Sequence, residues 1–372
     1  METAMSPVRL EKLFTEMVKT GLDGLALNPG PSLTYMTGLK FHLMERPVVM
    51  LFAPGNSPAI VLPELETAKL STLSYPVQPF PYGENPDEWD ASFAKAVKAL
   101  GLNGKKIGVE PGCIRLLEFG YVRKGAPDAD FPDSSKVVGS LRLHKDAAEA
   151  AAMRRAVDVA QRALEVVIPQ IRIGMTEREV AAELVVQLLR HGSEPEMSFS
   201  PIVSSGPNSA NPHASPSERR LQHGDLLVVD WGAVVDGYLS DLTRTFALGD
   251  VDPEYKKIHQ TVLEANQAGR AAARPGHACA EVDKAARDVI EKSGYGRYFF
   301  HRTGHGIGME SHEEPYIRSG NMQLMEPGMA FTVEPGIYLT DRNGVRIEDD
   351  MLITENGAEC LSNMVRELRV IG

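Results

Sequence analysis

Five residues in the C-terminal two-thirds of the chain have the types and positions expected of a metal-binding set. They comprise four carboxylates and one imidazole, each at the end of a short apolar run or in a glycine-rich turn: Asp230, Asp241, His305, Glu334 and Glu348. A carboxylate that closes an apolar strand incurs a large desolvation cost unless a cation meets it. Because oxygen ligands outnumber the single nitrogen, the set favours Mn²⁺, Co²⁺ or Fe²⁺ over a structural Zn²⁺ site. Two ions about 3.5–4 Å apart can share a water, and the resulting hydroxide attacks a polarised carbonyl.

Three further histidines accompany this set. His301 and His312 lie in the same glycine-rich run as His305, and His213 lies in a polar loop of Pro, Ser and Asn. The glycines of the run allow the backbone to approach a ligand closely. Any one of these acids or histidines alone would be interpreted as a strand end, a turn cap or a solvated side chain. Their combination predicts a hydrolytic metal site.

Composition sets the class of protein. The 372 residues suggest two domains, and the 43% apolar and 24% charged content is that of a soluble globular protein. No apolar run approaches the roughly 18 residues of a membrane span, and no secretory signal is recognisable near the N-terminus. Cys113, Cys279 and Cys360 are widely spaced, which indicates reduced thiols in a cytoplasmic protein. The net charge of −11 argues against nucleic-acid binding.

Hydrophobic patterning predicts an α/β domain over residues 1–142 and a second domain over residues 143–372. In the first domain we expect helices at 9–19 and 88–100, strands at 25–27 and 106–109, a hairpin of 47–53 with 59–62, and a loop at 125–133. The second domain begins with a long alanine-rich helix, 146–171, which we expect to bend or end at Pro169.

The second domain contains a weak internal repeat. Four residues recur 102 positions later: Gly174, Glu179, Val180 and Gly192 as Gly276, Glu281, Val282 and Gly294. Three others recur 104 positions later: Gly224, Asp230 and Gly232 as Gly328, Glu334 and Gly336. Chance recurrence of common residues is the alternative, but the order of helix, helix, strand, acid, hairpin and acid is also kept. We therefore predict two similar halves around a pseudo-twofold axis, which suits a pair of metal ions.

The sequences around the five residues resemble those of the pita-bread metallopeptidases, the creatinase/prolidase-type M24 family. The matching motifs are Val-Val-Asp230-Trp-Gly, Ser-Asp241-Leu-Thr-Arg-Thr, Gly-His305-Gly-Ile-Gly, Val-Glu334-Pro-Gly and Arg-Ile-Glu348-Asp. The resemblance spans about residues 145–370, and the preceding domain is similar to the creatinase/prolidase N-terminal domain. Methionine aminopeptidases generally lack that domain, so the resemblance implies the Xaa-Pro dipeptidase (prolidase) or Xaa-Pro aminopeptidase branch. It implies an α/β N-terminal domain and an α+β pita-bread catalytic domain.

The resemblance also implies roles for individual residues. Asp230 would chelate one metal, Asp241 and Glu348 would bridge both, and His305 and Glu334 would bind the other. Glu334 would accept a proton from the bridging water, while His213 and His312 would contact the substrate and stabilise the tetrahedral intermediate. His301 would lie near the substrate. The two divalent ions would be Mn²⁺ in preference to Co²⁺, Fe²⁺ or Zn²⁺.

One position departs from the family pattern. Some prolidases carry an arginine after the Glu-x-Pro that follows the equivalent of His312, and it binds the carboxylate of the substrate. Tyr316 occupies that position in this chain, so we expect Arg318 or Arg346 to replace the arginine. The strict dipeptidase interpretation therefore competes with an aminopeptidase P acting on longer peptides.

Two other functions stay open at this stage: a hydrolase of a small non-peptide amide on the same fold, and a non-catalytic binding module. We favour a dipeptidase because the N-terminal domain is compact. The expected partner is a proline-containing di- or oligopeptide, not a nucleic acid or a membrane. The resemblance further implies a homodimer in which the N-terminal domain of one subunit helps to enclose the site of the other.

Overall fold

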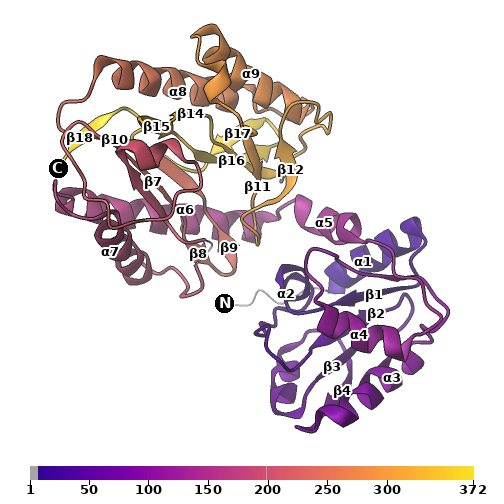
Figure 1. Cartoon of the computed structure of the whole chain (residues 1–372). Coiled ribbons are helices and arrows are strands. Elements are labelled where there is room, and N and C mark those ends of the chain that lie inside the picture. The colour runs from indigo at the N-terminus through magenta and orange to yellow at the C-terminus, as the bar shows by residue number, and fades with distance from the viewer. Residues whose placement is uncertain (1–6, 198) are drawn as a thin grey trace. The chain divides into compact units, whose positions relative to one another are not determined.

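A computed structural model describes residues 7–197 and 199–372 of the protein (Figure 1). The chain divides into two compact units, Met1–Arg142 and Leu143–Gly372, and each contains its own sheet and helices. None of the helices in the described residues is both long and apolar enough to cross a membrane.

The first unit is built on a five-stranded sheet in the order β4-β3-β2-β1-β5. Its strands are β1 (Gly24–Leu27), β2 (Val49–Phe52), β3 (Ala59–Pro63), β4 (Gln78–Tyr82) and β5 (Ile107–Gly108). β2 is antiparallel to β3, which confirms the predicted hairpin, whereas β4 and β5 join the sheet by parallel pairing. A short turn joins β2 to β3, whereas β4 and β5 follow longer connections that contain helical segments, as parallel pairing requires.

Helices flank this sheet. They are α1 (Pro7–Thr20), α2 (Pro31–Thr37), α3 (Trp89–Ala99), α4 (Leu116–Gly125) and α5 (Ser135–Leu143), with 3₁₀ turns η1 (Glu64–Thr72) and η2 (Pro86–Glu88). α1 and α3 confirm the two predicted helices, and the chain from 126 to 133 is irregular, as predicted. α3 buries Phe93 and Val97 in the same apolar cluster as Leu51 of β2, which anchors the helix on the sheet.

The second unit begins with α6 (Ala147–Val167). Asp146 caps this helix, because its side chain accepts hydrogen bonds from the backbone N–H of Ala148 and Glu149, and Glu149 in turn accepts from Asp146 N. The predicted end at Pro169 is confirmed, because the last turn tightens into the 3₁₀ segment η3 (Ile168–Gln170). The other helices are α7 (Glu177–Arg190), α8 (Pro253–Ala272) and α9 (Cys279–Lys292).

Two sheets form the centre of this unit. The first has the order β18-β10-β7-β6 and comprises β6 (Ile202–Ser205), β7 (Leu226–Trp231), β10 (Leu242–Leu248) and β18 (Arg369–Ile371). The second has the order β12-β11-β13-β16-β17 and comprises β11 (Gly304–Gly306), β12 (Glu313–Ile317), β13 (Ala330–Val333), β16 (Asp349–Thr354) and β17 (Gly357–Cys360). Short hairpins of β8 (Val234–Val235) with β9 (Tyr238–Leu239), and of β14 (Gly336–Leu339) with β15 (Asn343–Arg346), complete the unit. The 3₁₀ turns η4 (Gly206–Ala210) and η5 (Gly296–Tyr298) lie in its loops.

The predicted internal repeat is confirmed by the order of these elements. α6 and α7 cover the strands from one side and α8 and α9 from the other (Figure 1). In the first half, Asp230 lies near the end of β7, the β8–β9 hairpin follows, and Asp241 precedes β10, which pairs antiparallel with β7. In the second half, Glu334 follows β13, the β14–β15 hairpin comes next, and Glu348 precedes β16, which pairs antiparallel with β13. Repeat-related glycines also share a left-handed backbone, since φ is +92° at Gly174 and +80° at Gly276.

Candidate functional site

The five predicted ligand residues come from five different places in the second unit and meet at one cavity. Asp230 lies in β7, Asp241 just before β10, His305 in β11, Glu334 just after β13 and Glu348 between β15 and β16. All five line a single cavity of about 400 Å³. Both halves of the repeat therefore contribute carboxylates to one concave surface, as the sequence predicted.

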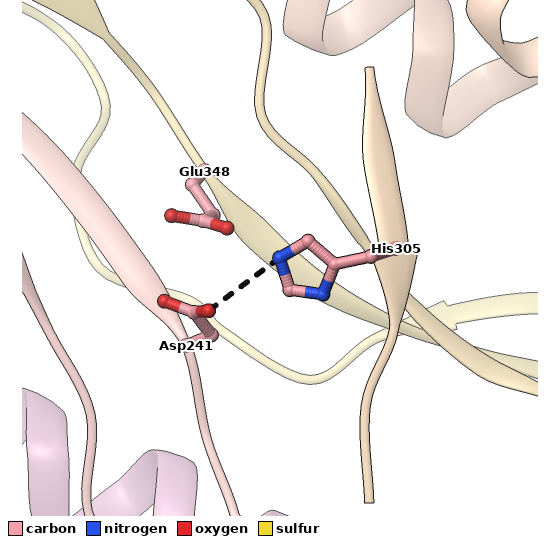
Figure 2. A group of neighbouring side chains, drawn as sticks. All are labelled: Asp241, His305 and Glu348. Carbon is pink, nitrogen blue, oxygen red and sulfur yellow. Dashed lines mark ion pairs between the residues drawn. The ribbon is translucent and has the colours of Figure 1, made fainter. Parts of the chain in front are cut away.

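Three of the five lie close enough for their ligand atoms to share an ion. Ligand atoms of Asp241, His305 and Glu348 all lie within 4.8 Å of one another, and Figure 2 shows these side chains pointing toward one another. His305 Nε2 is 3.8 Å from Asp241 Oδ2 and 3.5 Å from Glu334 Oε1. These separations are too long for direct hydrogen bonds, and they match donors arranged around a central cation.

The carboxylates are buried, and few positively charged groups of the protein lie near enough to offset their negative charge. Asp241 is 6% exposed and Glu348 1% exposed. Burial, reinforced by the neighbouring carboxylates, holds the pKa of Asp241 and of Glu348 well above the usual range. Burial also raises the pKa of Glu334 to about 7. The acids are therefore poorly accommodated as free anions.

Unpaired oxygens support the same interpretation. Asp230 Oδ1 and Glu348 Oε1 are buried and have no hydrogen-bond partner among the described residues. Only one guanidinium in the described part of the chain, that of Arg346, hydrogen-bonds to the carboxylate group of any of the four acids. Four ionised carboxylates against this one cation leave three negative charges, which divalent cations would neutralise. The donor set thus fits the predicted metal centre.

His305 is suited to be a ligand in its neutral form. Burial lowers its pKa to about 3, and His312 contributes to the shift. Its Nδ1 lies 3.2 Å from the carbonyl oxygen of Gly306, so a proton on Nδ1 leaves Nε2 free to face the carboxylates.

The glycines beside His305 have a structural reason that differs from the predicted one. A Cβ at Gly304 would lie 1.9 Å from Thr332 O, and one at Gly306 would lie 2.2 Å from Glu314 O. These carbonyls belong to β13 and to β12, the two strands that flank β11. The glycines therefore allow the strands to pack closely, and close approach of a ligand is not needed to explain them.

The three predicted histidines all line the cavity: His213, His301 and His312. The ring centroid of His312 is 3.9 Å from that of His305. His301 is held between Arg302 O, 2.6 Å from its Nδ1, and the Tyr338 hydroxyl, 3.0 Å from its Nε2. Burial lowers the pKa of His301 to about 4 and also lowers that of His312. The rings of His301 and His312 are thus neutral near pH 7, and each carries one N–H donor.

Arg346, predicted as a substrate-binding residue, lines the cavity, but its N–H groups are engaged by neighbouring side chains. Its Nη2 donates to Asp230 Oδ2 at 2.6 Å, its Nη1 to the Tyr338 hydroxyl and its Nε to Thr243 Oγ1. Thr243 Oγ1 in turn donates to Glu348 Oε2 at 2.6 Å. Arg346 therefore holds two of the acids in place, and we no longer expect it to bind the carboxylate of a substrate.

The other two predicted substrate-binding positions lie outside the residues that line the cavity. Arg318 is exposed and donates to the carbonyl oxygen of the adjacent Ser319. The ring of Tyr316 lies beneath the guanidinium of Arg302, with 4.4 Å between the Arg302 Cζ and the ring centroid. Arg302 does line the cavity, and the sequence analysis missed it. Its position beside His301 and within the glycine-rich run was the available signal.

The sequence analysis also missed Tyr338, Thr243 and the apolar wall of the cavity formed by Phe199, Ile202 and Pro212. Nothing in the local sequence around Phe199 or Ile202 distinguishes them from core residues. Their role depends on β6 lying beside the strand that carries Asp230.

Comparison with known proteins identifies the family. Residues 151–355 match metallopeptidase family M24, and residues 9–144 match the creatinase/prolidase N-terminal domain. The chain belongs to metallopeptidase family M24. It is 34% identical to the Xaa-Pro dipeptidase of Pyrococcus horikoshii over 97% of this chain and 98% of that protein. Among solved structures it resembles the dipeptidase PepE of Mycobacterium ulcerans, with 37% identity and a TM-score of 0.90 over 100% of this chain and 99% of that chain. It also resembles a prolidase from Thermococcus sibiricus, with 34% identity and a TM-score of 0.92 over 98% of each chain.

This M24 membership confirms the predicted family and fold, a creatinase-type N-terminal domain followed by a pita-bread catalytic domain. The protein is therefore an enzyme, a metallopeptidase, and the alternative of a non-catalytic binding module is set aside. Membership also implies divalent metal binding, consistent with the Asp241–His305–Glu348 cluster.

Proposed function

We propose that this M24 enzyme is a Xaa-Pro dipeptidase that uses two divalent metal ions. The observation that carries the proposal is the complete set of four acids and His305 facing one cavity with three further histidines. The names of the relatives support the dipeptidase class, since they include a Xaa-Pro dipeptidase and a prolidase. Asp230, Asp241, His305, Glu334 and Glu348 would hold the ions.

When bound, the two ions would polarise the scissile carbonyl and lower the pKa of a water molecule between them. The side chains would handle the protons. Glu334 is the acid that is 15% exposed at its side chain and faces the cavity, so it is the group placed to accept and return a proton. Arg346 fixes Asp230, and Thr243 fixes Glu348, so that neither acid can turn away from the cavity.

His312 would donate a hydrogen bond to the oxygen of the scissile carbonyl. Arg302 Nη2 lies 3.2 Å from His312 Nδ1, and a guanidinium can only donate. The neutral ring therefore carries its proton on Nε2, the atom that is free to donate to a substrate. His213 would act from the other wall, and His301, oriented by Tyr338, would contact the substrate nearby.

The size and lining of the cavity suit a small peptide with a proline ring. Its volume of about 400 Å³ lies within the range of small-ligand pockets. Phe199, Ile202 and Pro212 provide an apolar wall against which a pyrrolidine ring can pack.

Arg302 is the cation that we propose for recognition of the carboxylate at the end of a dipeptide. It lines the cavity, and in the described residues it forms no ion pair with any carboxylate. Its guanidinium donates to His312 Nδ1 and stacks on Tyr316, which fixes its plane and leaves other N–H groups available. This assignment replaces Arg318 and Arg346 in that role.

Arg302→Gln is expected to lower kcat/KM for a Xaa-Pro dipeptide about 10- to 100-fold, because one charge-assisted interaction with the free carboxylate is lost. The same substrate with an amidated C-terminus should lose much less kcat/KM in the variant, because a glutamine amide can still donate to His312 Nδ1. Steady-state kinetics on the two substrates measure the difference. Arg318→Gln is the matched control, since Arg318 is exposed and does not line the cavity. Equal losses of kcat/KM on the substrate with a free carboxylate and on the amidated substrate would contradict the assignment. A loss seen only in Arg318→Gln would contradict it as well.

The overall proposal is tested by removing metal with a chelator and restoring Mn²⁺, Co²⁺, Fe²⁺ or Zn²⁺ in turn. We expect cleavage of Xaa-Pro to return, most strongly with Mn²⁺, and to exceed cleavage of Xaa-Pro-Xaa. Preference for the longer peptide would identify an aminopeptidase P. Folded, metal-loaded enzyme that hydrolyses neither peptide but cleaves small non-peptide amides would refute the proposal. A homodimer stays a prediction of the resemblance, and a cytoplasmic location stays a prediction from the widely spaced cysteines.

A further inference from the structure

Glu177, which lies outside the cavity and has no assigned role, is a fully buried carboxylate without a cationic partner. It is the first residue of α7 and is 0% exposed. Among the described residues no lysine, arginine or histidine pairs with it, and all its hydrogen-bond donors are uncharged. The N-terminus of α7 and these donors stabilise the charge in place of a counter-ion.

The donors of Glu177 belong to the two ends of one loop. Oε1 accepts from Ser205 N at 2.7 Å and from Ser205 Oγ at 2.9 Å. Oε2 accepts from Ser217 N at 3.0 Å and from Ser217 Oγ at 2.7 Å. Asn208 Nδ2 lies 3.2 Å and 3.1 Å from the two oxygens and donates between them. One carboxylate thus joins the beginning and the end of residues 206–216.

Residues 206–216, which we call the His213 loop, form a wall of the cavity. Five of its residues line the cavity: Pro212, His213, Ala214, Ser215 and Pro216. Only the η4 turn at its beginning has regular structure, and His213 itself is exposed. A loop with so little secondary structure holds its side chains in place through its anchors, and Glu177 connects both ends.

The hydrogen bonds of Glu177 require both oxygens to be acceptors. Each oxygen faces a backbone N–H, which cannot turn away or become an acceptor. A glutamine at this position keeps the shape but places an NH₂ group against one of these N–H groups, at Ser205 or at Ser217. One end of the His213 loop must then move.

We infer that Glu177 is a positioning residue of the active site, which fixes the His213 loop and thereby holds His213 against the cavity. The inference rests on the proposed function, because contact between His213 and the substrate gives the loop its role. Glu177 neither lines the cavity nor contacts the proposed metal ligands. Its removal should therefore affect the loop and leave the metal centre intact.

The test compares Glu177→Gln with Glu179→Gln in the full chain. Glu179 lies on the same turn of α7 but is exposed and only caps the helix through Thr176 N, a bond that glutamine can also accept. We expect Glu177→Gln to keep wild-type metal content and to lose about 10- to 100-fold in kcat/KM on a Xaa-Pro dipeptide. Glu179→Gln should match the wild type in both. Loss of metal in Glu177→Gln, or full activity, would overturn the inference.

A double-mutant cycle distinguishes positioning of His213 from general loss of structure. His213→Ala should cost much less activity in the Glu177→Gln background than in the wild type, because the variant has already misplaced the histidine. Additive losses would overturn the inference. Ser217→Ala, which removes one hydroxyl donor and keeps the backbone N–H, is a milder variant in case Glu177→Gln does not fold, and the same non-additivity is expected.

Hydrogen exchange provides a measurement that does not depend on activity. Amides of residues 206–216 should exchange faster in Glu177→Gln, while those of β7, β10 and β13 stay as in the wild type. Unchanged exchange in the loop would overturn the inference even in an active enzyme. If the wild type instead cleaved no Xaa-Pro peptide, the proposed function would fail while the exchange measurement still tested the anchoring of the loop.

Discussion

Asp241→Asn is expected to abolish metal binding and peptidase activity together, with activity falling on the order of 1000-fold or more. Asp241 is one of the three residues whose ligand atoms lie within 4.8 Å of one another, and it is proposed to bridge both ions. The substitution replaces a negatively charged oxygen ligand with a neutral amide, which weakens the attraction of the cluster for divalent cations. Arg346 is the one guanidinium that pairs with a carboxylate of this cluster in the described residues. Metal analysis of the purified variant and turnover of a Xaa-Pro dipeptide measure the two losses. Glu348→Gln should behave in the same way, since Glu348 belongs to the same cluster.

A control in the preceding β8–β9 hairpin separates this loss from unfolding. Asp236→Asn also neutralises an aspartate, but Asp236 is exposed, and its φ of 53° is a conformation that asparagine tolerates. We expect this variant to keep both metal and activity. An Asp241→Asn enzyme that retained two ions would show that Asp241 is not a bridging ligand.

The thermal stability of the metal-free proteins tests the same electrostatic argument. In the folded metal-free protein, burial and neighbouring acids hold the pKa of Asp241 above its ordinary value. A carboxyl whose pKa is raised by folding destabilises the folded state at pH values above its unfolded pKa. Metal-free Asp241→Asn should therefore melt at or above the temperature of the metal-free wild type at pH 8. A clearly lower melting temperature would indicate that the variant lost structure and not just a ligand.

The proposed metal-ligand residues, which the structure brings to one cavity, could be located from sequence because their signals are local. Each acid interrupts or closes an apolar run, and burying such a group without compensation is costly enough to be informative. The repeat could be predicted for a similar reason, since Gly174 and Gly276 mark turns that need a positive φ. Helices with strong amphipathic patterns, such as α1 and α3, were also predictable, whereas the short α2 and α4 were not.

The residues that orient the ligands could not be predicted, because their partners are distant in sequence. Arg346 lies two residues before Glu348, but it hydrogen-bonds to Asp230, 116 positions away, because β15 turns it toward β7. Glu177 likewise acts on residues 28 and 40 positions later. The sequence placed Arg318 close to the departing position Tyr316 and gave no reason to choose Arg302, whereas in the structure only Arg302 lines the cavity. Long-range side-chain geometry thus limits what the sequence alone can indicate about specificity.

His312→Ala is expected to keep both metal ions and to lose about 100- to 1000-fold in kcat, with KM changed little, because its hydrogen bond strengthens as charge develops on the carbonyl oxygen. His312 lines the cavity but is not one of the three clustered ligand residues. Arg302 donates to its Nδ1 and lowers the pKa of the ring together with burial, so the neutral ring presents an N–H at Nε2.

His312→Gln provides the sharper comparison, because its amide can still donate a hydrogen bond from a similar distance. It should recover part of the kcat that alanine loses, which a residue with only a packing role would not show. His277→Ala is the matched control, since His277 is an exposed histidine that pairs with Glu281 on the surface. Loss of metal in His312→Ala would make His312 a ligand. Equal kcat for the alanine and glutamine variants would instead remove hydrogen-bond donation from its role.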